Sequence, residues 1–412
     1  MTNLPQGWEV RRLEEITNIK GGKRLPKGEK LLDDNTKFAY IRVADFQDNG
    51  TVNLKNIKFI NENAYNILKN YKIYDDNLYI SIAGTIGKSG IIPKELNGSI
   101  LTENAVKLEY IQNNISNKFM YFFTLSNMFK TQIQISTKIV AQPKLAITRL
   151  KQIEIPLPPL KEQERIVGIL DESFAKIDES IKILEQDLLN LDELMQSALQ
   201  KAFNPLKDNT KENYKLPQGW EWKSLGEIGE IITGTTPSKN NPNFYGNEYP
   251  LFKPSDLNGD VIIKFASDNL SKLGFDNARN IPKDTILIVC IGASIGKVGL
   301  SGVNGSCNQQ INAIIPNSAF ASKYLFFVCL SNYFQTILKK NASQTTLPII
   351  NKTEFSKLQI PLPPLKEQEQ IASYLDELSS NVKNLKQNYQ AQIKDLQELK
   401  KSLLDKAFKG RL

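Results

Sequence analysis

The chain has 412 residues and a formal net charge of +8, and its sequence contains no histidine. This length leaves room for two or three domains, each with its own core. Without histidine there is no Ser-His-Asp triad, no imidazole general base and no histidine-ligated zinc site. Enzymes that use carboxylate, lysine or tyrosine chemistry are not excluded.

The cysteines and the apolar runs indicate in which cellular compartment the protein works. Cys290, Cys307 and Cys329 form no Cys-x-x-Cys pair, so we expect them to be core residues in a reducing environment. Met1–Arg12 lacks the apolar stretch of a secretory signal, and no apolar run approaches the roughly 18 residues of a membrane span. We therefore expect a cytoplasmic protein.

The first 155 residues are expected to form a mixed α/β block. Asn77–Ile82 has the pattern of a buried strand, and Phe119–Lys130 has the length and periodicity of a helix. Gly84–Ser89 superficially matches a phosphate-binding loop, but only two residues separate its first glycine from Gly-Lys, where four are needed. We interpret it as a tight turn that presents Lys88.

A long helix follows the first block. Pro158-Pro159 ends the preceding extended stretch, and apolar residues then recur at alternating spacings of three and four over Val167–Ala202. Five heptads of this kind favour a coiled coil, about 53 Å long at about 1.5 Å per residue. Its predicted seam includes Leu170, Ile177, Leu184 and Leu191.

The rest of the chain repeats the first half. Leu4–Glu9 returns identically as Leu216–Glu221, and the ten residues from Ile155 return identically from Ile360. A period of about 200 residues is too long for a solenoid, so the chain is a tandem duplication. Thr285–Ile291 is predicted to be a buried strand and Ser322–Lys339 a helix, as in the first block.

The second helical segment keeps the rhythm of the first. Its apolar pattern predicts a seam of Ile371, Leu375, Leu378, Val382, Leu385, Tyr389, Gln392, Leu396, Leu399 and Leu403. Two equal heptad segments, joined through Asn204–Lys215 and a second block, suit an antiparallel pair. The alternative is two independent surface helices, each packed on its own domain.

The basic surplus lies on the blocks and not on the helices. Residues 1–160 carry a net charge of +7 and residues 204–365 a net charge of +4, whereas residues 161–203 carry −5. A cluster such as Lys20, Lys23, Arg24, Lys27 and Lys30 suits contact with phosphates. Ordinary solubilising charge explains it equally well.

Catalytic motifs are weak throughout. Asn241–Phe244 only partly matches the motif of adenine methyltransferases, and no glycine-rich loop precedes it. The acidic pairs at Asp33-Asp34 and Asp75-Asp76 have no counterpart at metal-ligand spacing. We predict no catalytic residue and no metal site on this chain.

The whole chain strongly resembles the specificity subunit of type I restriction–modification systems. The resemblance rests on the duplicated Leu-Pro-Gln-Gly-Trp, the Thr-Gly-Thr-Thr-Pro-Ser run at 233–238, the paired Thr-Ile-Gly-Lys and Ser-Ile-Gly-Lys, and the doubled Pro-Leu-Pro-Pro-Leu-Lys-Glu-Gln. The first block departs from this pattern at one place: it has Lys20-Gly-Gly-Lys-Arg-Leu-Pro-Lys27 where the second block has the usual Gly-Thr-Thr-Pro-Ser form.

The resemblance implies an α+β fold: two mixed α/β target-recognition domains separated by two long helices that form an antiparallel coiled coil, with an internal pseudo-twofold repeat. The expected domains are 1–155, helical spacer 156–204, 205–360 and helical spacer 361–412. Each domain would read one half of a bipartite, asymmetric site in double-stranded DNA. The coiled coil would set the spacer and dock two modification subunits.

The resemblance also implies that the chemistry belongs to partners. Modification subunits would bind S-adenosylmethionine and methylate adenine N6, and restriction subunits would use ATP and Mg²⁺ to cut. This chain would hold no cofactor and would not be an enzyme. The alternatives are a coiled-coil scaffold joining two protein-binding domains and a standalone nuclease or methyltransferase, which the missing motifs disfavour.

We expect DNA contacts from loop and turn residues. In the first block these are Lys23, Arg24, Lys27, Arg42, Lys88 and Lys144. In the second block they are Thr235, Thr236, Ser238, Lys239, Lys253, Lys297 and Gln344. Within the seam of the second helix, Leu375, Val382, Tyr389, Leu396 and Leu403 recur at every seventh residue. Phosphate contacts would position each block, and arginine, glutamine or asparagine would read base edges.

Overall fold

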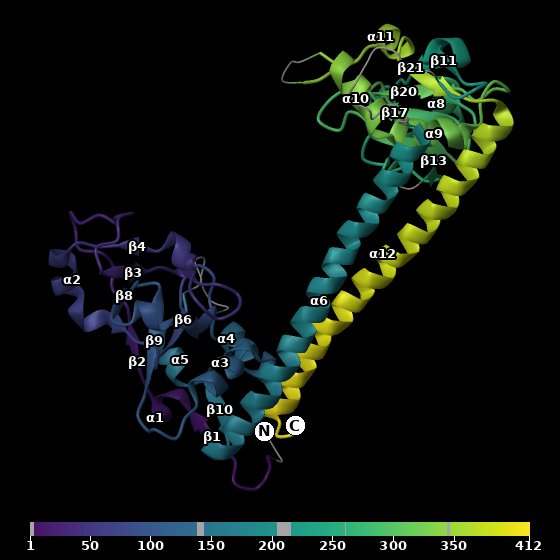
Figure 1. Ribbon diagram of the computed structural model, residues 1–412. Coiled ribbons are helices and arrows are strands. Elements are labelled where there is room, and N and C mark those ends of the chain that lie inside the picture. The colour runs from purple at the N-terminus through teal and green to yellow at the C-terminus, as the bar shows by residue number, and fades with distance from the viewer. Residues whose placement is uncertain (1–3, 138–143, 204–215, 260, 344–346) are drawn as a thin grey trace. The chain divides into compact units, whose positions relative to one another are not determined.

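The computed structural model describes residues 4–137, 144–203, 216–259, 261–343 and 347–412. The chain forms two compact units, one containing residues up to Ile183 together with Ala391–Leu412 and the other containing Leu184–Gln390. Each unit holds one globular block and parts of two long helices, α6 (Leu160–Phe203) and α12 (Leu365–Phe408) (Figure 1). The connection predicted through Asn204–Lys215 lies outside the described residues.

The first block is built on two four-stranded sheets. One has the order β2-β9-β6-β7 and is antiparallel throughout; the other has the order β4-β3-β8-β5 with a parallel pair at its centre. The strands are β2 (Thr17–Gly21), β3 (Ala39–Ile41), β4 (Lys58–Phe59), β5 (Lys72–Ile73), β6 (Leu78–Ser81), β7 (Ser89–Ile91), β8 (Ser99–Leu101) and β9 (Ala105–Tyr110). Along β6, Leu78 and Ile80 join the core beneath the helices and Tyr79 joins the core of the second sheet, so both faces are buried.

The second block repeats this topology. Its sheets have the orders β12-β20-β17-β18, extended by β14, and β15-β13-β19-β16, again with a parallel central pair. The strands are β12 (Ile231–Thr233), β13 (Tyr245–Phe252), β14 (Ile262–Ile263), β15 (Asp268–Leu270), β16 (Asn280–Ile281), β17 (Ile286–Val289), β18 (Val298–Ser301), β19 (Gly305–Cys307) and β20 (Ile311–Ile314). The predicted internal repeat and α+β class are confirmed.

A short antiparallel pair connects each block to its helix. In the first block β1 (Glu9–Arg12) pairs with β10 (Glu154–Leu157), and in the second β11 (Glu221–Ser224) pairs with β21 (Gln359–Leu362). The repeated sequences at the start and end of each block therefore lie side by side. The Pro-Pro pair that follows each second strand stops the pairing, and the helix begins directly after it.

The helices of the blocks differ from the predicted ones at two serines. The helix expected over Phe119–Lys130 is two helices, because Ser126 adopts an extended conformation and its hydroxyl accepts the Phe129 N–H at 3.3 Å. Ser331 does the same to Phe334 at 3.2 Å. The block helices are α1 (Leu13–Ile16), α2 (Glu62–Leu68), α3 (Asn117–Leu125), α4 (Asn127–Thr137), α5 (Ile147–Lys151), α7 (Leu225–Ile228), α8 (Lys272–Asp276), α9 (Ser322–Leu330), α10 (Asn332–Asn341) and α11 (Lys352–Ser356).

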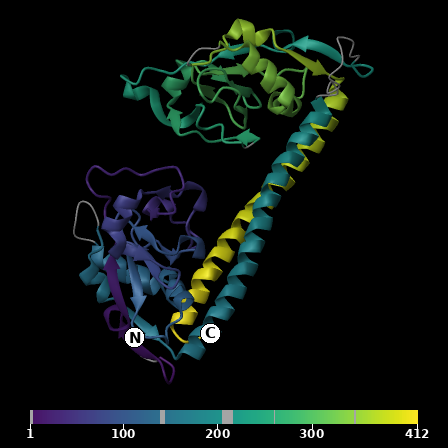
Figure 2. The ribbon, with the colours of Figure 1, turned by 60° about the vertical axis from the view of Figure 1, so that its left-hand side comes forward.

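The two long helices run antiparallel within each unit (Figure 2). In the first unit Asp178 pairs with Lys400, and Arg165 donates to the Leu412 carbonyl at 2.9 Å. In the second unit Asp192 pairs with Lys386. Four predicted seam residues are buried and five half-buried: Leu170, Ile177, Leu375 and Val382, then Leu184, Leu191, Tyr389, Leu396 and Leu403. The predicted antiparallel coiled coil is confirmed.

Three alternate positions in the middle of the second seam lie one residue later than predicted. Leu385 and Leu399 are 40% and 45% exposed, and Gln392 is exposed as well. The positions that face the partner helix are half-buried and are Lys386, Ile393 and Lys400. Lysine at a seam position escapes an apolar count, yet its aliphatic stem covers the seam while its ammonium reaches an aspartate.

The repeated Gln explains part of the shared sequence after the prolines. Gln163 is 1% exposed; it donates to the Pro158 carbonyl at 2.9 Å and accepts the Ser116 N–H at 2.8 Å. Gln368 makes the same two bonds, to the Pro363 carbonyl and from the Ala321 N–H, each at 2.9 Å. Each amide thus fastens the start of a long helix to the start of a block helix.

The three cysteines are buried and unpaired, as expected. Burial raises the pKa of Cys290 and of Cys307 to about 12, so these thiols stay protonated. Within the described ranges, no helix is both long and apolar enough to cross a bilayer.

Candidate nucleic-acid interface

Loops from both sheets meet along one edge of each block. In the first block the Gly22 N–H donates to the Ala105 carbonyl and the Lys23 N–H to the Leu101 carbonyl, each at 2.9 Å. These bonds place the loop after β2 across the turn between β8 and β9. A β-carbon on Gly22 would lie 2.1 Å from the Thr102 carbonyl oxygen, so only glycine fits there.

The second block builds the same crossing. Gly234 donates to the Ile311 carbonyl at 3.0 Å, and a β-carbon on it would lie 2.2 Å from the Cys307 carbonyl oxygen. Gly22 and Gly234 are therefore equivalent, although the residues that follow them differ. The departure noted between Lys20–Lys27 and the second block's Thr-Gly-Thr-Thr-Pro-Ser lies in side chains and not in the backbone crossing.

The Ile-Gly-Lys turns complete the edge. Each joins two antiparallel strands, β6 to β7 and β17 to β18. Gly87 and Gly296 have φ values of +86° and +92°, which favour glycine. The Gly87 N–H donates to the Ser81 carbonyl and the Gly296 N–H to the Val289 carbonyl, each at 2.9 Å. A phosphate-binding loop would lead into a helix, so the interpretation as a tight turn is confirmed.

We call these segments the first edge and the second edge. The first edge consists of Gly22–Arg24, Ala83–Lys88, Thr102–Asn104 and Lys144, which pairs with Ala83. The second edge consists of Gly234–Lys239, Ile291–Lys297, Asn308–Gln310 and Ile349, which pairs with Ile291.

The first edge carries cations in different states. Lys23, Arg24 and Lys144 are exposed, and so is Lys27, which follows the first edge in the chain. Arg24 donates from Nε to Glu103 at 2.7 Å although its side chain is 80% exposed, and half-buried Lys88 pairs with Asp48 at 2.9 Å. An exposed arginine held by a carboxylate is oriented without being removed from solvent.

Arg42 is engaged more deeply than the sequence indicates. Its guanidinium makes a two-point contact with buried Asp45, at 3.0 Å from Nε and 2.6 Å from Nη2. Nη2 also donates to the Asn56 carbonyl at 3.0 Å. The Asp45 hydrogen bond is the main cause that raises the pKa of Arg42. Arg42 borders the first edge, since the carbonyl of its neighbour Ile41 accepts the Thr102 N–H, and its side chain ties Asp45 to the segment at Asn56.

The second edge is richer in hydroxyl and amide groups. Thr236 donates to Gln309 at 2.7 Å, Thr235 accepts the Arg279 N–H at 3.0 Å, and the Ser238 hydroxyl accepts the Asn240 N–H at 3.3 Å. Lys239 and Lys297 are exposed, and Lys297 donates to the Pro254 carbonyl at 3.3 Å. Lys253 is half-buried and pairs with Asp268. Gln344 lies outside the described residues.

The electrostatics of the first edge centre on Glu103. Partial burial alone would raise the pKa of Glu103, but hydrogen bonds from Arg24, its own backbone and Thr102 together lower it below its usual value. The same pairing, chiefly through the hydrogen bond, raises the pKa of Arg24. Both groups are charged near neutral pH, and a phosphate approaching Arg24 would have to compete with Glu103.

Sequence patterns missed three residues that lie in the edges or bond to them. Glu103 and Gln309 each hold a predicted contact residue, and Arg279 donates from Nη1 to the Thr233 carbonyl at 2.7 Å. All three come from segments far away in sequence and belong to no motif. Two local partners could be seen in the sequence: Asp45, three residues after Arg42, and Asp256, three residues after Lys253.

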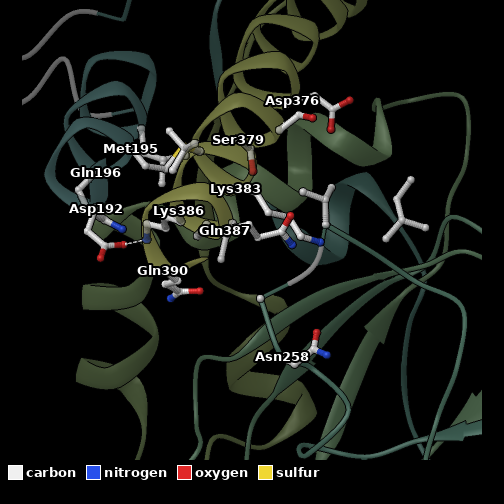
Figure 3. A pocket seen from close by; sticks show the side chains of 17 residues that line it. Asp192, Met195, Gln196, Asn258, Asp376, Ser379, Lys383, Lys386, Gln387 and Gln390 are labelled. Carbon is white, nitrogen blue, oxygen red and sulfur yellow. Dashed lines mark hydrogen bonds and ion pairs between the residues drawn. The ribbon is translucent and has the colours of Figure 1, made fainter. Parts of the chain in front are cut away.

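A pocket of about 730 Å³ shares no lining residue with the second edge. It is lined by α6, α12 and residues that include Asn258, Gly259, Val261 and Ile262, and Figure 3 shows Asp192 and Lys386 facing each other on its wall. Within the described part of the chain no group of three or more Cys, Asp or Glu side chains could hold a metal ion.

Comparisons with known proteins agree with this duplicated architecture. The family model for the type I restriction modification DNA specificity domain matches twice, over residues 5–188 and 217–395. The type I restriction enzyme HindI specificity subunit of Haemophilus influenzae is 34% identical over 206 residues, which cover 48% of this chain and 42% of that protein. The StySPI specificity subunit of Salmonella potsdam is 23% identical over 99% of this chain and 90% of that protein.

A solved structure shows the same fold. A chain from a structure on complex assembly and conformational transition of the type I R-M system aligns with a TM-score of 0.78 at 22% identity, covering 100% of both chains. The two edges, the paired long helices and the duplicated blocks thus define a two-domain protein of the specificity class. The chain belongs to the family of type I restriction–modification DNA specificity proteins.

This membership decides between the alternatives. The chain serves DNA sequence specificity, and the scaffold with two protein-binding domains is not favoured. As a specificity subunit it is not itself an enzyme.

Proposed function

We propose that each edge reads one half of a bipartite, asymmetric DNA site. The observation that carries the proposal is the duplicated edge: one backbone frame occurs in both blocks, with exposed cations on each and different polar side chains around them. Equal frames suit the repeated geometry of a duplex, and unequal side chains suit different base sequences. The functional division would follow 1–155, 156–204, 205–360 and 361–412.

The exposed cations would contact phosphates. Lys23, Lys27 and Lys144 in the first block, with Lys239 and Lys297 in the second, have ammonium groups accessible to DNA. Arg24 and the hydroxyl and amide groups of Thr235, Thr236, Ser238 and Gln344 would read base edges. Lys88 would have to leave Asp48 to reach a phosphate, and Arg42 and Lys253 would act mainly by holding the loops.

The long helices would set the spacer between half-sites. Each has 44 residues, about 66 Å at about 1.5 Å per residue, which is nearly two turns of B-DNA. Two modification subunits would dock on the helices and supply S-adenosylmethionine-dependent methylation of adenine N6. Restriction subunits would supply ATP- and Mg²⁺-dependent cleavage. The complex would work in the cytoplasm, and this chain would bind none of these cofactors.

Footprinting tests the proposal. The chain is co-expressed with its modification subunit, and the complex is bound to duplexes that contain the site found by methylome sequencing of the host. We expect two protected half-sites separated by an unprotected spacer. A complex that protects no DNA, or one continuous stretch only, would contradict the proposal.

A further inference from the structure

One side-chain position is equivalent in the crossing loops of the two edges. Gly22 and Gly234 make the same backbone bond, and the residues two places further on are Arg24 and Thr236. Both of these side chains are exposed. The same point of the backbone frame therefore presents a guanidinium in the first block and a hydroxyl in the second.

A second equivalent position lies on the turn that each crossing loop meets. The turns 102–105 and 308–311 are each closed by a backbone hydrogen bond from the last N–H to the first carbonyl, at 3.2 Å and 3.1 Å. The first N–H of each turn donates at 3.0 Å to the end of a strand in the other sheet, β3 or β13. The second residue of each turn is Glu103 in the first block and Gln309 in the second, so these two residues are equivalent.

A side-chain hydrogen bond joins the two positions in both blocks. Arg24 donates from Nε to Glu103 at 2.7 Å, and the Thr236 hydroxyl donates to Gln309 at 2.7 Å. The two bonds have the same place and the same length, although the two blocks share no residue type there. We call Arg24 with Glu103, and Thr236 with Gln309, the edge pair of each block. An unchanged backbone that carries a changed pair is the arrangement expected of residues that read different bases.

The edge pair of the first block leaves the end of a guanidinium open to a ligand. The Arg24 side chain is 80% exposed, and its Nη1 and Nη2 groups donate no hydrogen bond within the described residues. Glu103 is itself held by the Thr102 hydroxyl at 3.1 Å, and buried Tyr40 fixes the loop by donating to the Lys23 carbonyl at 2.8 Å. The fork of an arginine fits O6 and N7 of guanine. Because Glu103 keeps its negative charge beside the guanidinium, a phosphate is a poorer ligand here than the uncharged edge of a base.

The second block exchanges the roles of the two positions. Gln309 is exposed, and its Oε1 accepts the Thr236 hydroxyl. Its Nε2 group donates to no other part of the described chain, and Oε1 keeps a second lone pair. An amide with a free donor and a free acceptor matches N7 and N6 of adenine. The threonine thus fixes the direction of the amide, as Glu103 fixes the direction of the guanidinium.

We propose that each edge pair reads one base of its half-site. In the first half-site Arg24, positioned by Glu103, contacts a guanine. In the second half-site Gln309, positioned by Thr236, contacts an adenine. The inference rests on the proposed function, since it needs each edge to face DNA, and it goes further by assigning a base to each edge. Glu103 and Gln309, which belong to no sequence motif, are thereby specificity residues.

The test is a selection of duplexes by the full chain in complex with its modification subunit. Each base of the two half-sites is randomised in turn, and sequencing of the bound fraction gives the base preference at every position. The parent should prefer guanine at one position of the first half-site and adenine at one position of the second. Arg24→Met should lower the guanine preference about tenfold or more and leave the second half-site unchanged. Gln309→Met should do the converse for the adenine.

Two substitutions test the positioning role of Glu103. Glu103→Gln keeps an acceptor for the Nε of Arg24, so the guanine preference should persist. Glu103→Ala removes the acceptor and should lose that preference as fully as Arg24→Met does, although it also removes a negative charge that opposes DNA. A purely structural role would instead lower binding to all sequences alike, and that outcome would overturn the assignment.

A matched control lies one residue away on the same loop. Lys23→Ala removes an exposed cation, so it should weaken binding to all sequences alike and leave every base preference as in the parent. The double variant Thr236→Arg with Gln309→Glu places the edge pair of the first block on the second edge. Both residues are exposed, and the exchange should change the preferred adenine of the second half-site to guanine.

The outcomes separate the inference from the function on which it rests. Parent-like base preferences for Arg24→Met and Gln309→Met, with both half-sites still protected, would overturn the inference. An equal change of preference caused by Lys23→Ala would also overturn it, because the effect would then belong to the loop and not to the edge pair. A parent complex that protects no DNA would refute the proposed function instead.

Discussion

The helical segments and the edges show two ways in which a duplicated chain treats its copies. At the helices, equal residues make equal contacts: Lys118 pairs with Asp171 at 2.6 Å, and Lys323 pairs with Asp376 at 2.6 Å. At the edges the backbone bonds are equal and the side chains are not, as with Arg24–Glu103 in one block and Thr236–Gln309 in the other. The backbone frame is thus duplicated, whereas the side chains around it differ between the two blocks.

The ends of the two long helices explain why their sequences stayed alike. Phe203, at the end of α6, packs on Tyr324 of the second block at a ring distance of 5.4 Å. Phe408, at the end of α12, packs on Phe119 and Phe123 of the first block at 5.1 and 5.4 Å. Each block is thus held by the start of one long helix and the end of the other. A change in either copy of the shared segment disturbs a block core.

Lengthening both helices should have the largest effect on function. Seven residues added after Asp192 and seven before Lys386 keep the heptad seam and the facing positions, and extend each helix by about 10 Å. Under the proposal, methylation of the parent site is lost and a site with a longer spacer is modified. Methylome sequencing of the host measures this, and an unchanged spacer would show that the helices do not set the distance.

Truncating the equivalent phenylalanines should have the largest effect on stability. Phe203→Ala and Phe408→Ala each remove a buried ring and should cost about 3–5 kcal/mol of unfolding free energy. Because the contacts are equivalent, the two losses should be similar, and each should fall on a different unit. Urea unfolding followed with probes in each block checks this. If either variant lost less than about 1 kcal/mol of unfolding free energy, the two phenylalanine contacts would not be equivalent.

Removing the repeated buried amide should cost less. Gln163→Met and Gln368→Met keep the volume but leave a buried N–H and a carbonyl without a partner, which should cost about 1–3 kcal/mol each. Gln397→Met, on the exposed face of α12, is the matched control and should be nearly neutral. Equal thermal stability of all three variants would show that the buried amides do not contribute to stability.

Much of the fold could be predicted because its signals are repeated and local. The doubled Pro-Pro stops and the heptad spacing mark both long helices, and Asn77–Ile82 is recognisable as a buried strand. The breaks at Ser126 and Ser331 could not be predicted from periodicity, since the apolar pattern continues across them. The seam lysines were missed because an apolar count does not register a lysine stem.

The edge was predictable in outline and not in detail. The turns around Lys88 and Lys297 follow from their glycines, and the exposure of Lys23, Lys27 and Lys239 follows from their loops. The engagement of Arg24 by Glu103, and of Thr236 by Gln309, depends on segments 79 and 73 residues away. Only the packing of the two sheets brings those segments together, and no local pattern carries that information.

The exposed ion pairs should give the smallest effect. Asp171→Asn and Asp376→Asn each remove one partner of a solvent-accessible pair, so each should lower the unfolding free energy by less than about 1 kcal/mol. Thermal unfolding at low and high salt measures the change, which should shrink as salt screens the charges. A salt-independent loss of several kcal/mol would mean that these pairs hold the blocks as firmly as the buried contacts do.

Methylome sequencing of the host tests the central claim most directly, with the parent chain compared with a chain carrying Thr236→Ala and Lys297→Ala on the second edge. The account predicts that the parent modifies one motif with two different half-sites and an unspecified spacer. The variant should weaken methylation overall and relax the sequence of one half-site, while the other half-site stays unchanged. Relaxation of both half-sites together, or of neither, would contradict the claim that each edge reads its own half of the target.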